Sequence, residues 1–216
     1  MINPQKLETA VSTLHPKSLK KAKDAISFRC KDYLIRLDRM SRALEGGKVS
    51  TPSGVRQFSR ALSLYQLAYL PTTPKTCPFC IQHFEGNRCE GCAYAATHGG
   101  RCDAETSAFG QLIEAIYDLA KVIQQLSHED VASKSFTETG NQVNHQIAVL
   151  LNIIAASKEL AENTIRSLPE ATSNRLMEIK AEYVKTTLKL LPVDLMNSKE
   201  VERKRQDALD KSEIYW

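Results

Sequence analysis

Residues 16–47 read PKSLKKAKDAISFRCKDYLIRLDRMSRALEGG. Two apolar series run through this stretch at seven-residue intervals: Leu19, Ile26, Tyr33 and Met40, and then Cys30, Leu37 and Leu44. A heptad repeat of this kind predicts a long helix that packs along another helix. Pro16 suits the first helical position, and the Gly46-Gly47 pair suits the end of the helix. The stretch therefore predicts a helical bundle.

The remaining chain shows further helical patterns, separated by prolines or polar residues. Residues 4–14 favour a short helix, Thr51-Pro52 opens a long one, and Pro71–Pro74 ends it. A seam over residues 105–127 steps by three and four, and Pro169 divides two later helices, over 143–168 and 176–191. Residues 128–136 form a polar connection. The apolar positions are Val55, Phe58, Leu62, Tyr65, Tyr69, Phe109, Leu112, Ile116, Leu119, Ile123, Leu126, Val143, Ile147, Leu150, Ile154, Ala161, Ile165, Leu168, Leu176, Ile179, Tyr183, Leu188 and Leu191.

These patterns predict an all-α fold, an antiparallel bundle of long helices. The paired Cys-x-x-Cys motifs between residues 77 and 92 add an inserted small zinc-knuckle or ribbon module to this prediction. The low aromatic content, 6%, also argues against a sheet-rich fold. We expect basic N-terminal helices over residues 1–70, the zinc module over 75–104, a helical bundle over 105–192 and a charged C-terminal helix or tail over 193–216. The stretch Lys199–Lys211 offers little to bury, so we expect it to be frayed or ordered by a partner.

Four of the six cysteines form two Cys-x-x-Cys pairs, Cys77 with Cys80 and Cys89 with Cys92. Paired motifs of this spacing in a reducing compartment are typical of zinc sites, because four thiolates complete the tetrahedron that zinc prefers. Such a closed site leaves no position for water or substrate and is structural. The sequence therefore predicts one structural Zn²⁺ ion.

Several details of this site stay open. Cys102 or His98 could replace one of the four cysteines as a ligand. A redox dithiol, a disulfide pair and an iron–sulfur cluster are the other chemistries that paired cysteines support. Between the pairs, Glu85-Gly86-Asn87 has the composition of a hairpin turn, which would bring the two pairs face to face.

The pattern Cys77-Pro78-Phe79-Cys80, Cys89-Glu90-Gly91-Cys92 and His98-Gly99-Gly100-Arg101-Cys102 resembles a small cysteine-rich module of uncharacterised bacteriophage and prophage proteins. In that module a fifth cysteine likewise follows a glycine shortly after the second pair. Ala93 departs from the pattern, since a proline is usual there. The resemblance covers residues 77–102 alone. It implies a phage setting and no particular activity.

Charge is unevenly distributed, with 13 Lys/Arg against 5 Asp/Glu in residues 1–60 and 16 against 20 in the remainder. A basic stretch of one helix could follow nucleic-acid phosphates or dock on an acidic protein. It could equally be a solvated face with intrahelical pairs, such as Asp32–Arg36 and Asp38–Arg42. The candidate binding residues are Lys17, Lys20, Lys21, Arg29, Lys31, Arg36, Arg39 and Arg42.

The chain contains no phosphate-binding glycine loop, no His-Glu-x-x-His motif and no nucleophile elbow, so we expect no enzyme. We also expect a cytoplasmic protein, in the host cytoplasm if phage-encoded, without a membrane segment. The leading hypothesis is a non-enzymatic zinc-stabilised protein that binds another protein, for example a phage-encoded regulator or inhibitor of a host protein complex. The alternatives are a nucleic-acid-binding regulator and a virion structural component. Homodimer formation stays open.

Overall fold

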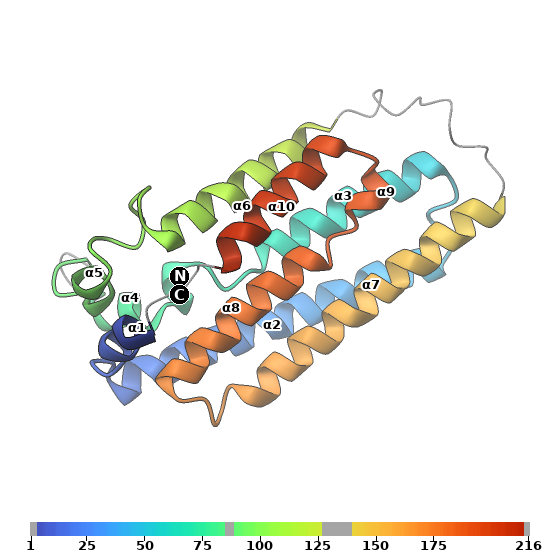
Figure 1. The fold of residues 1–216 in the computed structure, drawn as a ribbon. Helices are drawn as coiled ribbons and strands as arrows, with labels where there is room; N and C mark the ends of the chain where they lie inside the picture. The colour runs from blue at the N-terminus through green and yellow to red at the C-terminus, as the bar shows by residue number, and fades with distance from the viewer. Residues whose placement is uncertain (1–3, 85–88, 127–139, 214–216) are drawn as a thin grey trace.

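A computed structural model describes residues 4–84, 89–126 and 140–213, and within these ranges the chain is helical without strands (Figure 1). The helical part of the predicted fold class is therefore confirmed. The elements are α1 Pro4–Val11, α2 Pro16–Glu45, α3 Pro52–Ala68, the 3₁₀ turn η1 Pro74–Thr76, α4 Pro78–Gln82, α5 Ala93–Thr97, α6 Ala108–Gln125, α7 Gly140–Ser167, α8 Ser173–Lys189, α9 Val193–Met196 and α10 Lys199–Glu213.

Hydroxyl side chains define the starts of three long helices. The side chain of Thr51 accepts a 3.1 Å hydrogen bond from the backbone nitrogen of Gly54 at the start of α3, as the sequence predicted. Ser107 caps α6 in the same way, through Gly110 at 2.9 Å, and Thr172 caps α8. Each cap satisfies a backbone N–H group that has no partner within its own helix.

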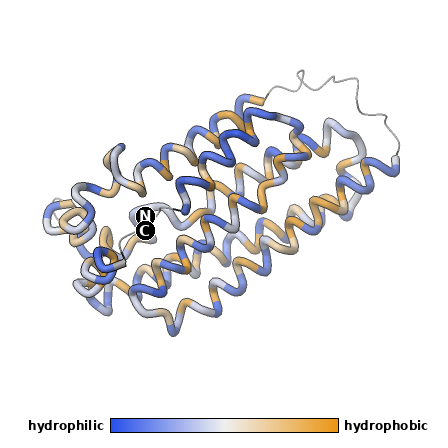
Figure 2. The backbone as a smooth tube through the Cα atoms, viewed as in Figure 1, coloured by the Kyte–Doolittle hydropathy of each residue, from blue (hydrophilic) through white to orange (hydrophobic). Residues whose placement is uncertain are grey.

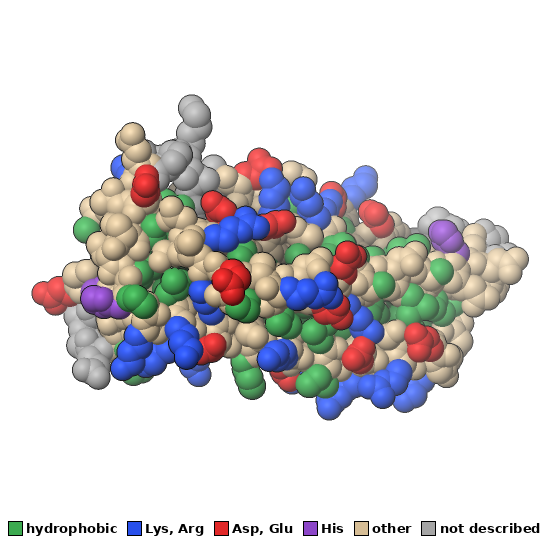
Figure 3. Space-filling model, turned by 90° about the horizontal axis from the view of Figure 1, so that it is seen from below, with side chains coloured by type: hydrophobic (Ala, Val, Ile, Leu, Met, Phe, Trp, Pro, Cys, Tyr) green, Lys and Arg blue, Asp and Glu red, His purple; other side chains and the backbone are tan. Residues whose placement is uncertain are grey.

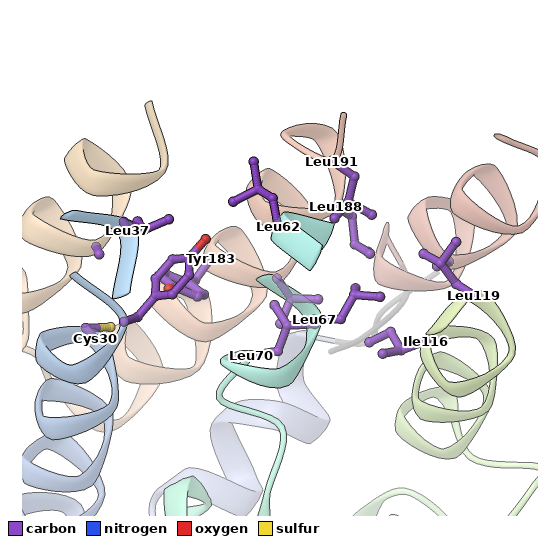
Figure 4. Packing of buried hydrophobic residues seen from close by; sticks show 14 of the residues in the cluster. Cys30, Leu37, Leu62, Leu67, Leu70, Ile116, Leu119, Tyr183, Leu188 and Leu191 are labelled. Carbon is purple, nitrogen blue, oxygen red and sulfur yellow. The ribbon is translucent and has the colours of Figure 1, made fainter. Parts of the chain in front are cut away.

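The long helices lie side by side and form an elongated body (Figure 1). Helix α2 packs along α7, α10 packs on α6 and α8, and α3 contacts α6, α7, α8 and α9. Orange apolar segments run along the helices in Figure 2, alternating with blue polar ones. The buried side chains of several helices converge in one core, shown from close by in Figure 4. Amphipathic helices of this kind are stable because they bury their apolar stripes against one another.

The heptad pattern of α2 corresponds to the face that is buried. Ile26, Cys30, Tyr33 and Leu37 are buried, while Leu19 and Met40 are half-buried against the same core. The seam predicted over residues 105–127 behaves similarly in α6, where Leu112, Ile116, Leu119 and Ile123 are buried. These helix predictions are confirmed.

The expectation that the C-terminal stretch offers little to bury is wrong. Helix α10 packs on α6 and buries Val201, Ala208 and Leu209. The side chain of Lys204 also pairs with Asp118 of α6. Three small or medium apolar residues form too sparse a stripe to stand out among the charges, yet they suffice because α6 offers a matching apolar face.

The cysteine-rich segment lies at one end of the elongated body, together with α1 (Figure 1). Its described residues form the two short helices α4 and α5, where the sequence predicted a knuckle or ribbon. Pro78 at the first turn of α4 and the alanines of α5 favour helix over strand. The predicted hairpin turn Glu85-Gly86-Asn87 and the polar connection 128–136 lie outside the described residues.

Among the helices that the structure describes, none combines the length and the apolar character needed to cross a membrane.

Candidate metal centre

The five cysteines between residues 77 and 102 all line one cavity of about 720 Å³ at the end of the bundle. The cavity is bounded on its other sides by aromatic residues and by one lysine from α8. The lining includes Cys77, Cys80, Cys89, Cys92, Cys102, Phe79, Tyr94 and Lys180. Three separate segments of the chain therefore bring their thiols to the same space.

Local backbone structure places each thiol. Cys77 directly precedes α4, so Cys80 follows within its first turn. Cys92 directly precedes α5, and its backbone nitrogen donates a 3.3 Å hydrogen bond to the backbone oxygen of Cys89. This tight turn passes through Gly91, whose φ of +76° is one that glycine adopts readily. The backbone oxygen of Cys102 accepts a 2.6 Å hydrogen bond from the hydroxyl of Ser107, the cap of α6.

The thiol of Cys80 lies between those of Cys77 and Cys102 and forms a hydrogen bond with each. The hydrogen bond from Cys80 is the main cause that lowers the pKa of Cys77 to about 6, and it also lowers the pKa of Cys102. As the shared donor, Cys80 has a raised pKa. The arrangement thus favours negative charge on the two outer sulfurs, and thiolate is the form of cysteine that binds metals.

The two remaining cysteines of the cavity differ from each other. Cys92 is buried, which is the main reason for its raised pKa, and it is close enough to Cys77 and Cys102 for their charges to act on it. Cys89 is half-buried, as Cys77, Cys80 and Cys102 are, and it lines the same cavity. Cys92 is therefore the most buried of the five cysteines that line the cavity.

Lys180 is the residue of this site that sequence reasoning missed. Its side chain is buried, with 2% exposure, and its Nζ donates a 3.3 Å hydrogen bond to the backbone oxygen of Thr76. Burial lowers the pKa of Lys180, and the neighbouring Cys77, Cys80 and Cys102 oppose that shift. In the sequence, Lys180 stands between Ile179 and Tyr183, two apolar positions of the α8 pattern. This position of a lysine on the apolar face is the signal from which its burial could have been predicted.

The donor set suits zinc, which binds thiolates at about 2.3 Å in a tetrahedron. Within the described residues, no three His, Cys, Asp or Glu side chains are already arranged around one metal position. Zinc binding by four of these thiols would therefore require their sulfur atoms to come closer together than they lie in this structure. The six cysteines, all within the described residues, form no disulfide with one another.

His98 lies apart from the thiols. Its ring stacks on Tyr94 with centroids 4.1 Å apart, and its Nδ1 is 2.8 Å from the hydroxyl oxygen of Thr97. Burial lowers the pKa of His98. His98 directly follows α5 and is not among the residues that line the cavity, whereas Cys80 and Cys102 both line it.

The predicted binding residues of α2 divide into two groups. Arg29 donates hydrogen bonds to the backbone oxygens of Ala68 and Tyr69 at the end of α3, and Arg36 contacts Asp32 at 3.5 Å and the hydroxyl of Tyr69. These two guanidinium groups therefore make contacts within the fold that join α2 to the end of α3. The other six lie exposed along α2: Lys17, Lys20, Lys21, Lys31, Arg39 and Arg42.

One predicted intrahelical pair is present and the other is wrong. The Asp32–Arg36 pair forms as expected. The carboxylate of Asp38 pairs instead with Lys158 of α7, and Arg42 donates a 3.3 Å hydrogen bond to the backbone oxygen of Asp38. The packing of α7 along α2 brings Lys158 within reach, which helical spacing alone does not reveal.

The comparisons with known proteins give no relative, because no protein-family model, no curated protein and no solved structure matches this chain.

Proposed function

We propose that this chain is a non-enzymatic, zinc-stabilised helical protein that binds another protein through the outer face of α2. The observation that supports the proposal most directly is the exposure of two large apolar side chains on that basic helix. Phe28 is 75% exposed and Ile35 is 51% exposed. A single exposed apolar residue needs no explanation, but two such residues on one face of a charged helix are typical of a docking surface.

Helical spacing puts these residues on one stripe. Phe28 and Ile35 are seven residues apart, two helical turns, and so they point to the same side. Lys31 stands between them, Lys20 and Lys21 precede them, and Arg39 and Arg42 follow. We call this stripe the α2 outer face. Figure 3 shows one side of the molecule, on which basic, acidic and hydrophobic side chains are interspersed.

The chemistry of the α2 outer face favours an acidic amphipathic protein segment as the partner. Apolar side chains of that segment would cover Phe28 and Ile35, and its carboxylates would meet the lysines and arginines on either side. Phosphate backbones do not need an apolar contact, and Arg29 and Arg36 are already used within the fold. The carboxylate of Asp24 also lies on this exposed stretch, where it would repel phosphate.

The zinc ion has a structural role in this proposal. Four thiolates complete its coordination, so no open position is left for a substrate. The ion would hold the segment between α3 and α6 against the end of the bundle, where its buried Phe79 and Tyr94 pack with Val11 of α1 and Met177 of α8. Only the resemblance of residues 77–102 to phage modules supports the further proposal of a phage-encoded regulator or inhibitor of a host protein complex, acting in the cytoplasm. A virion component is the alternative under that resemblance.

A photo-reactive amino acid at position 28 tests the proposal in cells. We expect cross-links to an acidic protein segment from position 28, and their loss when Lys20, Lys21 and Lys31 are changed to Glu. The matched control places the same reactive group at Lys189, an exposed position of α8, together with the charge reversal Lys189→Glu on its own. Equal cross-linking from both positions, or none from position 28, would contradict the proposal.

The nucleic-acid alternative rests on the six exposed cations of α2. It predicts a gel shift with DNA or RNA that weakens steeply between about 50 and 200 mM salt, because binding releases counterions. The same triple charge reversal should abolish that shift, whereas Phe28→Ala should not. A gel shift that persists after Phe28→Ala would favour the nucleic-acid-binding alternative. Loss of partner binding after Phe28→Ala would favour the protein-binding proposal.

A further inference from the structure

We infer that the interior of the bundle binds ordered water between four buried polar side chains that come from three of the long helices. These side chains, which we call the core polar cluster, are Tyr33 of α2, Gln66 of α3, and Tyr183 and Thr187 of α8. None of the four lines the cysteine-rich cavity. The water site is therefore separate from the candidate metal centre, and its presence does not depend on a metal ion.

Each member of the core polar cluster carries a buried oxygen atom without a hydrogen-bond partner of normal geometry. The hydroxyl oxygens of the three hydroxyl residues and the Oε1 of Gln66 find no partner among the residues that the structure describes. All four side chains are at most 2% exposed, so bulk solvent does not reach them. Buried polar atoms in folded proteins nearly always have a partner, which is either a protein atom or an ordered water molecule.

The amide of Gln66 lies where three helices meet. Its Nε2 donates hydrogen bonds of 3.1 Å to the hydroxyl oxygen of Ser157 in α7 and of 3.4 Å to the backbone oxygen of Leu190, which directly follows α8. The carbonyl of Leu190 can only accept, so the orientation of the amide is fixed and its Oε1 needs a separate donor. Ser157 cannot supply it, because its hydroxyl donates to the backbone oxygen of Ile153 at 2.8 Å.

The two tyrosine hydroxyls lie near this amide. Burial raises the pKa of Tyr33, and Ser157 and Gln66 are close enough to oppose that shift. Burial also raises the pKa of Tyr183, and Cys30 and Tyr33 of α2 are close enough to add to it. Figure 4 shows Tyr183 beside Cys30. The hydroxyls of α2 and α8 therefore face the same part of the interior as the amide of α3.

Thr187 differs from other buried hydroxyl residues of the core. Ser59, Ser63 and Ser157 each donate a 2.8 Å hydrogen bond to the backbone oxygen four residues earlier in their own helix. The Thr187 hydroxyl has no such bond within the described part of the chain. Thr187 lies in the last turn of α8, beside the carbonyl that Gln66 contacts, so its hydroxyl remains available to a ligand next to the amide.

The chemistry of the core polar cluster fits water and not an ion. The Oε1 of Gln66 can only accept, whereas hydroxyl groups can donate or accept. A water molecule offers both functions and typically makes about three hydrogen bonds when it is buried. The cluster contains no charged side chain, and an ion that is buried without an opposite charge is strongly disfavoured.

Crystallography and oxygen-17 relaxation dispersion of the unaltered full-length chain test the site directly. We expect density for water within about 3.2 Å of the cluster oxygens, and at least one long-lived internal water in solution. That water should be lost when Tyr33→Phe, Tyr183→Phe and Thr187→Val are combined. Tyr117→Phe is the matched control, because Tyr117 is 71% exposed, and it should keep the signal.

Stability gives a second readout, whose sign depends on whether water is bound. If it is, Tyr183→Phe or Thr187→Val removes a partner of the water, and the ratio of unfolded to folded protein should rise about 2- to 10-fold. If these hydroxyls are buried without any partner, their removal should lower that ratio, since burial of an unpaired polar group is unfavourable. Urea unfolding at pH 7 measures the ratio, which Tyr117→Phe should leave unchanged.

Several outcomes would overturn the water site. One is the absence of both the density and a long-lived water in the unaltered chain. Another is a long-lived water signal that the triple variant retains in full, and a third is a gain of stability in both single variants. If the triple variant does not fold, Tyr183→Phe alone replaces it in the relaxation measurement.

Discussion

The Nε of Arg29, in the middle of α2, donates a 3.1 Å hydrogen bond to the backbone oxygen of Tyr69, which ends α3. The same guanidinium also reaches the backbone oxygen of Ala68 and lies over the ring of Tyr69, 5.5 Å from its centroid. One cation thus satisfies two carbonyl groups that have no partner within their own helix. A residue that the sequence placed on a binding surface therefore holds two helices together.

Arg29→Ala should lower the free energy of unfolding by about 1–3 kcal/mol, because hydrogen bonds to a charged group contribute about that much. Arg29→Lys should restore only part of the loss, since a lysine ammonium lacks the planar fork that serves two carbonyls. Lys31→Ala, on the exposed side of the same helix, is the control and should stay within about 0.5 kcal/mol. Urea unfolding measures all three. An equal effect of Arg29→Ala and Lys31→Ala would show that the helix cap is energetically unimportant.

A second pair of variants tests which face of α2 is buried. Leu37 is fully buried and Ile35, two residues earlier, is 51% exposed. Leu37→Ala should lower the free energy of unfolding by about 2–5 kcal/mol, because it leaves a cavity in the core. Ile35→Ala should change stability by about 0.5 kcal/mol or less, as substitutions at exposed positions do. Thermal or urea unfolding of both variants checks the difference, and a large cost for Ile35→Ala would mean that α2 is oriented otherwise.

Alkaline pH should destabilise the fold through Cys30. Burial raises the pKa of the Cys30 thiol from its ordinary 9.0 to about 11. The unfolded chain therefore loses this proton first, and between about pH 9 and 11 the folded state binds more protons than the unfolded state. Under linkage, stability must then fall as the pH rises through this window. Tyr33 and Tyr183, whose pKa values burial also raises, act in the same direction at higher pH.

Urea midpoints measured from pH 7 to 11 check this dependence. Cys30→Ala should have a shallower decline between pH 9 and 11 than the unaltered chain, because it removes one of the groups that titrate. An identical slope in both proteins would assign the alkaline loss to other residues.

Helix α10 should contribute to global stability despite its charged composition. Leu209 is buried against the bundle. Leu209→Ala should therefore lower the free energy of unfolding by about 2 kcal/mol or more. Arg203→Ala, at an exposed position of the same helix, is the matched control. Hydrogen exchange should show protected amides throughout 201–212 in the unaltered chain. Rapid exchange of these amides, together with an unchanged free energy of unfolding in Leu209→Ala, would show that α10 is frayed.

Cys80→Ser should lower the zinc content and loosen residues 75–102 while most of the helical signal survives. The reason is that, among the residues that the structure describes, no buried member of the bundle's core cluster lies between Leu70 and Leu112. Elemental analysis, circular dichroism and hydrogen exchange measure the three effects, with Cys30→Ser as a control that leaves metal content unchanged. Collapse of all helicity in Cys80→Ser would show that the segment is integral to the bundle.

Much of the fold could be read from local patterns. The heptad of α2 and the stepped seam of α6 mark the faces that are buried, and Thr51 marks the start of α3 as a cap. The cysteine spacing likewise predicted which segment carries the thiols. Prediction was weakest where a few apolar residues stand among many charges, as in α10, because the burial of such a helix depends on its neighbour.

The sequence by itself determined the positions of the helices and the grouping of the cysteines into pairs suited to bind a metal. Helical periodicity, caps and Cys-x-x-Cys spacing are all patterns that extend over only a few residues. Only the tertiary structure decided that Cys102 adjoins Cys80, that Lys180 lies buried beside the thiols, and that Arg29 caps α3. Each of these relationships joins residues that are not neighbours along one helix. Local spacing carries no information about such contacts, since the packing of whole helices sets which side chains meet.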